Sequence, residues 1–256
     1  MPESSSIPSP SASPPPTAVV ACAVFEAEVR AFATGLSHLV SLTFLPQSLH
    51  NEPATLNVAL RQTVAAIEAD TQAEVIVLVY GVCSRGIERI PLRRCRMIVP
   101  RAHDCITLLL GSKERYRHYQ KTNPAIYWYS PGWNARDAVP GPRRHQRLQA
   151  EYTAKFDEDE AAYLLAMEKE LHAPYTTAAY VDLGIGDAAT NIAYTQQCAC
   201  WMGWDFERVS GDPRLLLDLL SGAWDDERFL SVQPRQWIQL SLDDRVIESI
   251  PASSAS

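Results

Sequence analysis

Two cysteines stand a few residues after short apolar runs in the first half of the chain. Residues 75–79 lead into Tyr80-Gly81-Val82-Cys83, and residues 97–99 lead into Pro100-Arg101-Ala102-His103-Asp104-Cys105. Such runs, short and rich in β-branched residues, are typical of strands buried on both faces. Because ligands bind beyond the carboxyl ends of strands in an open parallel sheet, we expect both thiols to lie at a ligand site.

Cys22 and His50 are predicted to reach the same edge of the sheet. A strand over residues 18–25 ends near Cys22, and a strand over residues 40–45 runs toward His50, just before a helix over residues 53–69. Three thiolates and one imidazole suit zinc or an iron–sulfur cluster, whereas soft sulfur disfavours magnesium and calcium. The predicted ligands are therefore Cys22, His50, Cys83 and Cys105. They come from separate elements, so no local spacing identifies the set. A core thiol explains Cys22 equally well, and packing or capping explains His50.

Neighbouring residues supply candidates for catalysis and substrate binding. Asp104 is predicted to cap the helix that begins after it. In the predicted site Asp104 or His103 transfers protons, and Arg101 binds the anionic end of a substrate. Gly184-x-Gly186-Asp187 forms a strand-to-helix turn whose amides could bind an anionic cofactor. This turn lacks the third glycine of a dinucleotide-binding fingerprint.

The remaining cysteines favour structural roles. Cys198 and Cys200 fall on a predicted helix, where side chains two positions apart point in different directions, so both are interpreted as core residues. Cys95 is assigned no role. Trp133, Tyr80 and Tyr116 either form the wall of a pocket or pack in the core.

Strands alternate with helices along most of the chain, which predicts a layered α/β fold with a mostly parallel sheet and helices on both faces. Two Rossmann-like halves around a cleft are the finer version of this prediction. The predicted parts are a disordered Ser/Pro-rich leader (1–16), a first half with the site (17–133), a second half (134–242) and a frayed tail (243–256). Within them we expect one helix over residues 105–120, a loop over 134–150 and a last strand over 229–232.

Composition narrows the class of protein. The 256 residues carry a net charge of -7, which argues against a nucleic-acid-binding protein. No apolar run approaches the roughly 20 residues of a membrane-spanning helix. Six cysteines are too few for a disulfide scaffold, and no signal peptide is evident, so we expect a soluble cytoplasmic protein with reduced thiols.

Several short motifs together carry a resemblance to a family. They are Leu49-His50, Tyr80-Gly81-x-Cys83, Pro100-Arg101-x-x-Asp104-Cys105, Leu108-Leu109-Leu110-Gly111-Ser112, Pro131-Gly132-Trp133, Gly211-Asp212-x-Arg214-Leu215-Leu216 and Gly222-x-Trp224-Asp225. Over roughly residues 18–235 the chain resembles the bacterial and archaeal domain of unknown function 1638. The resemblance implies a cytoplasmic protein, supports treating Cys22, His50, Cys83 and Cys105 as one site, and suggests a corrinoid or methyltransferase partner protein. His103 departs from the family pattern, where an acidic residue is expected.

The sequence therefore predicts a metalloenzyme, such as a lyase or transferase, that uses zinc or an iron–sulfur cluster on a small anionic molecule. A link to methyl-group or one-carbon metabolism follows only from the resemblance. Two alternatives stay open. One is a non-enzymatic carrier of metal, cluster or corrinoid, and the other is metal-free catalysis by Cys83 or Cys105.

Overall fold

The computed structural model describes residues 13–82 and 85–252. It contains a five-stranded sheet of order β2-β1-β3-β4-β8, a three-stranded sheet of order β5-β6-β7, and a hairpin of β9 and β10. All pairs in the three-stranded sheet are parallel, as are the pairs among β2, β1, β3 and β4, and β8 runs antiparallel to β4. The prediction of a mixed α/β fold with a mostly parallel sheet is confirmed.

The first part of the chain builds most of the larger sheet. Its elements are β1 (Thr17–Cys22), η1 (Ala23–Phe25), α1 (Glu26–Ala33), β2 (Leu39–Leu45), η2 (Gln47–Asn51), α2 (Pro53–Asp70), β3 (Val75–Val79), β4 (Arg96–Pro100), α3 (Cys105–Leu110) and α4 (Lys113–Thr122). The smaller sheet and its helices follow as β5 (Ile126–Tyr129), α5 (Pro131–Asn134), α6 (Pro142–Lys155), α7 (Glu158–Glu170), β6 (Thr177–Asp182), α8 (Ala188–Met202) and β7 (Asp205–Ser210). The chain then returns to the larger sheet through α9 (Arg214–Ser221), β8 (Phe229–Val232), β9 (Gln236–Leu240) and β10 (Ile247–Pro251).

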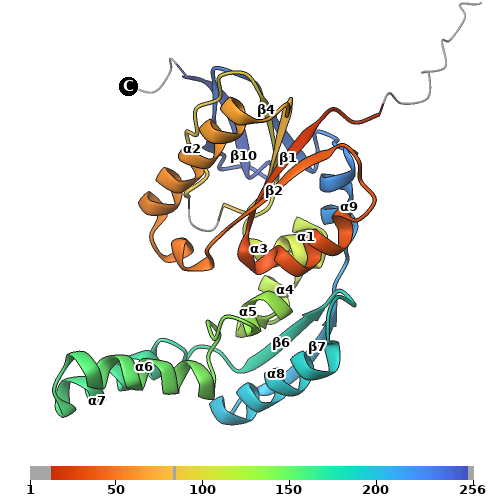
Figure 1. Cartoon of the computed structure of the whole chain (residues 1–256). Coiled ribbons are helices and arrows are strands. Elements are labelled where there is room, and N and C mark those ends of the chain that lie inside the picture. The colour runs from red at the N-terminus through yellow and green to blue at the C-terminus, as the bar shows by residue number, and fades with distance from the viewer. Residues whose placement is uncertain (1–12, 83–84, 253–256) are drawn as a thin grey trace, which may run out of the picture.

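The larger sheet is the centre of the main hydrophobic core. Every residue of β1 and β3 is buried, as expected for strands covered on both faces. On α2 the buried residues are Leu56, Leu60, Val64 and Ile67, whose spacing puts them on one face of the helix. Figure 1 shows α2 on one side of this sheet and α1 and α9 on the other. The larger sheet is therefore covered by helices on both faces.

Two predictions about helices are wrong. The single helix expected over residues 105–120 is divided into α3 and α4, because Gly111 adopts a left-handed φ of 83° and the Ser112 side chain accepts a hydrogen bond from the Arg115 amide at the start of α4. The loop expected over residues 134–150 contains most of α6. With α7 this helix forms a hairpin that projects to one side of the molecule (Figure 1).

The predicted domain limits and tail also differ from the structure. β5 belongs to the three-stranded sheet although it precedes residue 134, and β8 returns to the larger sheet. β8 is not the last strand, since β9 and β10 form an antiparallel hairpin after it. Residues 247–251 are therefore a strand rather than part of a frayed tail. β7 was not predicted at all.

Most of the predicted leader lies outside the described residues, but its last residues pack against the fold. The Pro16 carbonyl accepts a hydrogen bond from the Glu74 amide at 2.8 Å, just before β3. Pro16, which the prediction placed in the leader, is thus part of the fold. Across the described parts of the chain, none of the helices combines the length and apolar character needed to cross a membrane.

Candidate functional site

The carboxyl ends of β1, β3 and β4 are adjacent in the larger sheet, and a cysteine follows each of these strands. Cys22 is the last residue of β1, and Cys105 is the first residue of α3, which follows β4. Both are 5% exposed. Cys83, in the connection after β3, lies outside the described residues. The topology therefore brings the ends of β1, β3 and β4, and with them Cys22 and the start of α3, to one edge of the sheet.

Close contact joins the segment after β3 to the segment after β4. A Cβ atom on Gly81 would lie 2.5 Å from the Asp104 Cα, so only glycine fits there. The Val82 amide donates a hydrogen bond to the Ala102 carbonyl at 3.1 Å. Gly81 and Val82 directly precede Cys83, and Asp104 directly precedes Cys105. The segment after β3, up to Val82, is thus in direct contact with the segment that precedes Cys105.

A pocket of about 310 Å³ opens beside Cys105. Its polar lining includes Cys105, Asp104 and His50, and the remaining residues are mainly aromatic: Ile106, Ile126, Tyr127, Trp128, Trp133 and Tyr175. The His50 ring stands edge-on to the Trp133 ring, with centroids 6.2 Å apart and an angle of 89° between planes. Burial raises the pKa of Tyr127 to about 12, so this phenol keeps its proton at neutral pH.

The aromatic wall comes from the part of the chain that contains the smaller sheet. Gly132 on α5 lies directly against the Val24 carbonyl of η1, where any side chain would collide with the backbone. η1 begins immediately after Cys22, and Trp133 immediately follows Gly132. This contact therefore fixes Trp133 relative to the end of β1.

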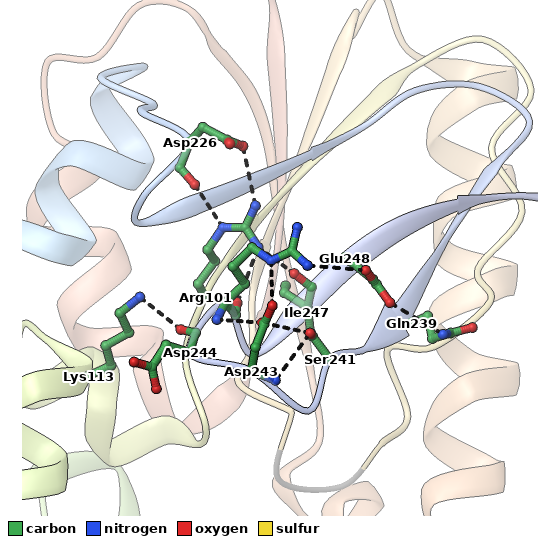
Figure 2. Close-up of polar contacts among 10 residues, drawn as sticks. Arg101, Lys113, Asp226, Gln239, Ser241, Asp243, Asp244, Ile247 and Glu248 are labelled. Atoms are coloured by element: carbon green, nitrogen blue, oxygen red, sulfur yellow. Dashed lines mark hydrogen bonds and ion pairs between the residues drawn. The ribbon is translucent and has the colours of Figure 1, made fainter.

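Arg101, the predicted substrate-binding residue, makes its contacts elsewhere. It is 6% exposed, and its guanidinium donates hydrogen bonds to the carbonyls of Asp226 (2.8 Å), Arg245 (3.2 Å) and Ile247. Nη2 also pairs with the Asp226 carboxylate at 3.3 Å. Figure 2 shows this side chain enclosed by the loop before β8 and the hairpin of β9 and β10. These contacts give Arg101 a role in packing the C-terminal hairpin.

Asp104 and His103 lie next to each other but differ in their surroundings. The Asp104 side chain accepts hydrogen bonds from the Thr107 amide (3.0 Å) and hydroxyl (3.2 Å), which confirms that it caps α3. His103 is exposed and stacks on Tyr116, with ring centroids 6.0 Å apart. His103 does not belong to the described lining of the pocket.

The predicted cofactor-binding turn is exposed at the end of β6. Gly184 and Gly186 have left-handed φ values of 71° and 72°, which explains the choice of glycine at both positions. The Gly184 amide donates to the Asp182 carboxylate at 2.8 Å, and Asp187 caps α8 through the Thr190 amide at 3.0 Å. The Gly184 amide, which the prediction assigned to an anionic ligand, thus already donates to a carboxylate of the chain.

The other cysteines lie apart from the pocket lining. Cys95 is fully buried and donates to the Ala73 carbonyl at 3.1 Å. Cys198 is fully buried and contacts Gly141, whereas Cys200 is exposed, so the core interpretation is wrong for Cys200. Burial raises the pKa of Cys95 and raises that of Cys198 to about 11, which favours the protonated thiol at both.

Some predicted site residues are brought together and others are not. His50, Asp104 and Cys105 share one pocket, whereas Cys22, Arg101, His103, Gly184 and Gly186 lie outside its described lining. Within residues 13–82 and 85–252, no three histidine, cysteine, aspartate or glutamate side chains are grouped closely enough to hold a metal ion. Sequence reasoning missed Tyr127, Trp128 and Tyr175. The aromatic run in β5 was the signal for Tyr127 and Trp128, whereas no pattern in the sequence singled out Tyr175, which precedes β6.

Comparison with known proteins gives one match. A family model described as "Protein of unknown function (DUF1638)" matches residues 44–220. That range contains the pocket residues His50, Asp104, Cys105, Trp133 and Tyr175. No curated protein and no solved structure matches the chain.

Proposed function

We propose that this chain, which belongs to the DUF1638 family of proteins of unknown function, is a metalloenzyme that acts on a small anionic molecule in the aromatic pocket. The proposed ligands are Cys105 and His50 together with Cys22 and Cys83. The contact of Gly81 and Val82 with the segment before Cys105 carries the proposal, because it supports convergence of two thiols from separate strands.

The chemistry of the donor atoms suits zinc or an iron–sulfur cluster, although the described ligands Cys22, His50 and Cys105 would have to approach one another to share one ion. Thiolate and imidazole are the preferred ligands of zinc, and thiolates hold iron–sulfur clusters. With three protein ligands, a zinc ion would supply Lewis-acid chemistry through its open position. A site with all four ligands bound to zinc would be structural instead.

The other pocket residues would orient and shield the reactants. The perpendicular contact with Trp133 restricts rotation of the His50 ring. Tyr127, Trp128 and Tyr175 would exclude water and stack on a flat substrate. Since Arg101 packs the C-terminal hairpin, the anionic group of the substrate would be bound by the metal rather than by this guanidinium.

The reaction class and setting are parts of the same proposal. A lyase or transferase in one-carbon metabolism, with a corrinoid or methyltransferase partner protein, is the activity suggested by the family resemblance. A cytoplasmic setting would keep the thiols reduced and able to bind metal.

Metal analysis of protein purified without oxygen tests the proposal. We expect stoichiometric zinc, or iron and sulfide with visible absorption, and we expect Cys83→Ser and Cys105→Ser each to lose it. Cys95→Ser and Cys198→Ser are matched controls, because both thiols are buried away from the pocket lining, and they should retain the metal. Equal retention in all four variants would refute the assignment.

Turnover separates the enzyme from the carrier alternative. A carrier would hold the same metal but pass it, or a cluster, to a partner without converting a small molecule. Metal-loaded protein should therefore be screened with small carboxylates and thiols, by mass spectrometry of the products. Conversion that is lost in Cys105→Ser supports the enzyme, whereas metal release to an acceptor protein without conversion supports the carrier.

A further inference from the structure

A second pocket of about 310 Å³ lies where the hairpin of α6 and α7 meets the end of α8. Leu148 from α6, Leu165 from α7, and Trp201 and Met202 from α8 provide its apolar lining. Trp201 is 44% exposed, which is high for such a large apolar side chain. The pocket thus offers an apolar surface that is already open to solvent.

Cations outnumber carboxylates in the lining of this pocket. Arg144 forms a bidentate ion pair with Glu168, in which Nε donates to Oε2 at 3.3 Å and Nη2 donates to Oε1 at 3.2 Å, and its Nη1 donates to the Ala138 carbonyl at 3.0 Å. These bonds hold the guanidinium in place and neutralise Glu168. Lys169 is exposed on the next position of α7 and adds a positive charge that Glu168 does not balance.

Two histidines add flat rings to the lining of this pocket. The His145 ring lies 5.2 Å from the Trp201 ring, at an angle of 45°. His172 is oriented by a 2.7 Å hydrogen bond between its Nδ1 atom and the Glu168 carbonyl. An aromatic or branched ligand body would lie against Trp201 and Leu165, with its charged end toward Lys169.

We infer that this pocket is a second binding site, and that its ligand is a small organic anion with an apolar or aromatic body, such as an aryl carboxylate. The apolar lining favours burial of the body, and the excess of positive charge favours an anionic end. Its volume is at the low end of the range for ligand pockets, which favours a small ligand.

The second pocket is separate from the candidate metal site but touches its wall. His172 lines the second pocket, and its ring lies 5.7 Å from the ring of Tyr127, which lines the first. The two linings have no residue in common. A ligand of the second pocket would therefore be linked to the first through His172, which contacts Tyr127 and whose carbonyl accepts a hydrogen bond from the Tyr175 amide at 3.1 Å.

Three probes of similar size and different charge test the inference: 3-phenylpropionate, 3-phenylpropan-1-ol and 3-phenylpropylamine. Binding to the full-length protein is measured by isothermal titration and ligand-observed NMR. We expect the carboxylate to bind about five-fold more tightly than the alcohol, and the amine to bind most weakly. Equal binding of amine and carboxylate, or no binding of any probe at millimolar concentration, would overturn the inference.

Variants locate the bound probe. Lys169→Gln should weaken the carboxylate about five-fold and leave the alcohol unchanged, whereas Lys155→Gln, the same change elsewhere on the hairpin, should alter neither. Leu165→Trp should fill the pocket and abolish binding of both, with folding checked by circular dichroism. Carboxylate binding that is lost in Cys105→Ser but retained in Lys169→Gln would assign the probe to the metal site and refute the second site.

Discussion

Replacing Glu28 with glutamine should stabilise the protein at pH 8 and have much less effect at pH 5. Glu28 lies on α1 and is fully buried, and neither of its carboxylate oxygens has a well-aligned hydrogen-bond partner among the described residues. Burial raises its pKa from the ordinary value of 4.5 to about 7, while its own backbone amide and the charge of Arg136 act in the opposite direction. At neutral pH the folded protein thus holds a carboxylate in an environment that disfavours charge.

The sign and size of the effect follow from these two pKa values. Between pH 4.5 and pH 7 the unfolded chain loses the Glu28 proton while the folded chain keeps it, so rising pH favours unfolding. Below this window the wild-type protein has the full stability contribution of the protonated group, and above it the contribution is lost. A difference of about 2.5 pKa units corresponds to a free energy of unfolding on the order of 3 kcal/mol.

Urea unfolding followed by tryptophan fluorescence at pH 5, 6, 7 and 8 measures the effect. The difference in unfolding free energy between Glu28→Gln and wild type should increase by about 2 to 3 kcal/mol from pH 5 to pH 8. Glu26→Gln, on the exposed side of the same helix, is the matched control and should change stability by less than about 1 kcal/mol. Parallel curves for Glu28→Gln and wild type would refute the reasoning.

Three further substitutions test the contacts around the candidate site. Arg101→Met should lower the unfolding free energy by about 3 kcal/mol, because three carbonyls lose a buried donor, and hydrogen exchange should quicken in β9 and β10. Asp104→Ala should cost about 1 kcal/mol through loss of the α3 cap, and Asp104→Asn should restore most of it in the same urea assay. Gly81→Ala should lower metal content together with stability, by about 1 to 3 kcal/mol, and a variant that keeps its metal would contradict the proposed convergence at Cys105.

The strands of the larger sheet were predictable because each is marked in the sequence by its own run of apolar residues. Residues 75–79 are a continuous apolar run, and the observed β3 has the predicted bounds. The helix after Pro53 was also predicted well, since its buried residues recur at helical spacing. In both cases one segment carries the whole signal.

Elements that bury little of their own surface were missed. On α6 only Leu148 is buried, so the helix lacks the apolar periodicity that would identify it. β7 has a single buried residue, Val209, and pairs only with β6 at the edge of the smaller sheet. Their stability depends on neighbours distant in the sequence, and a local pattern contains no information about those neighbours.

The candidate site was predictable only up to the edge of the sheet. The rule about strand ends led to Cys105, and the helix-cap pattern led to Asp104, which the structure confirms as a cap. The aromatic wall comes from β5, α5 and the segment before β6, which reach the pocket through tertiary contacts. Arg101 shows the opposite error, because its position beside the site gave no indication of its partners in the C-terminal hairpin.

Glycines show most clearly which features of the fold cannot be predicted from the sequence. At Gly184 the left-handed φ of 71° explains the residue, and a Cβ atom there would meet nothing within 4 Å. Gly81 and Gly132 do not have a left-handed φ. Each lacks a side chain because another backbone segment packs directly against it: Asp104 against Gly81, and the Val24 carbonyl against Gly132. In the sequence all three look like ordinary turn residues. Only the partner across the fold distinguishes a glycine that turns the chain from one that lets two segments meet, and the candidate site depends on the second kind.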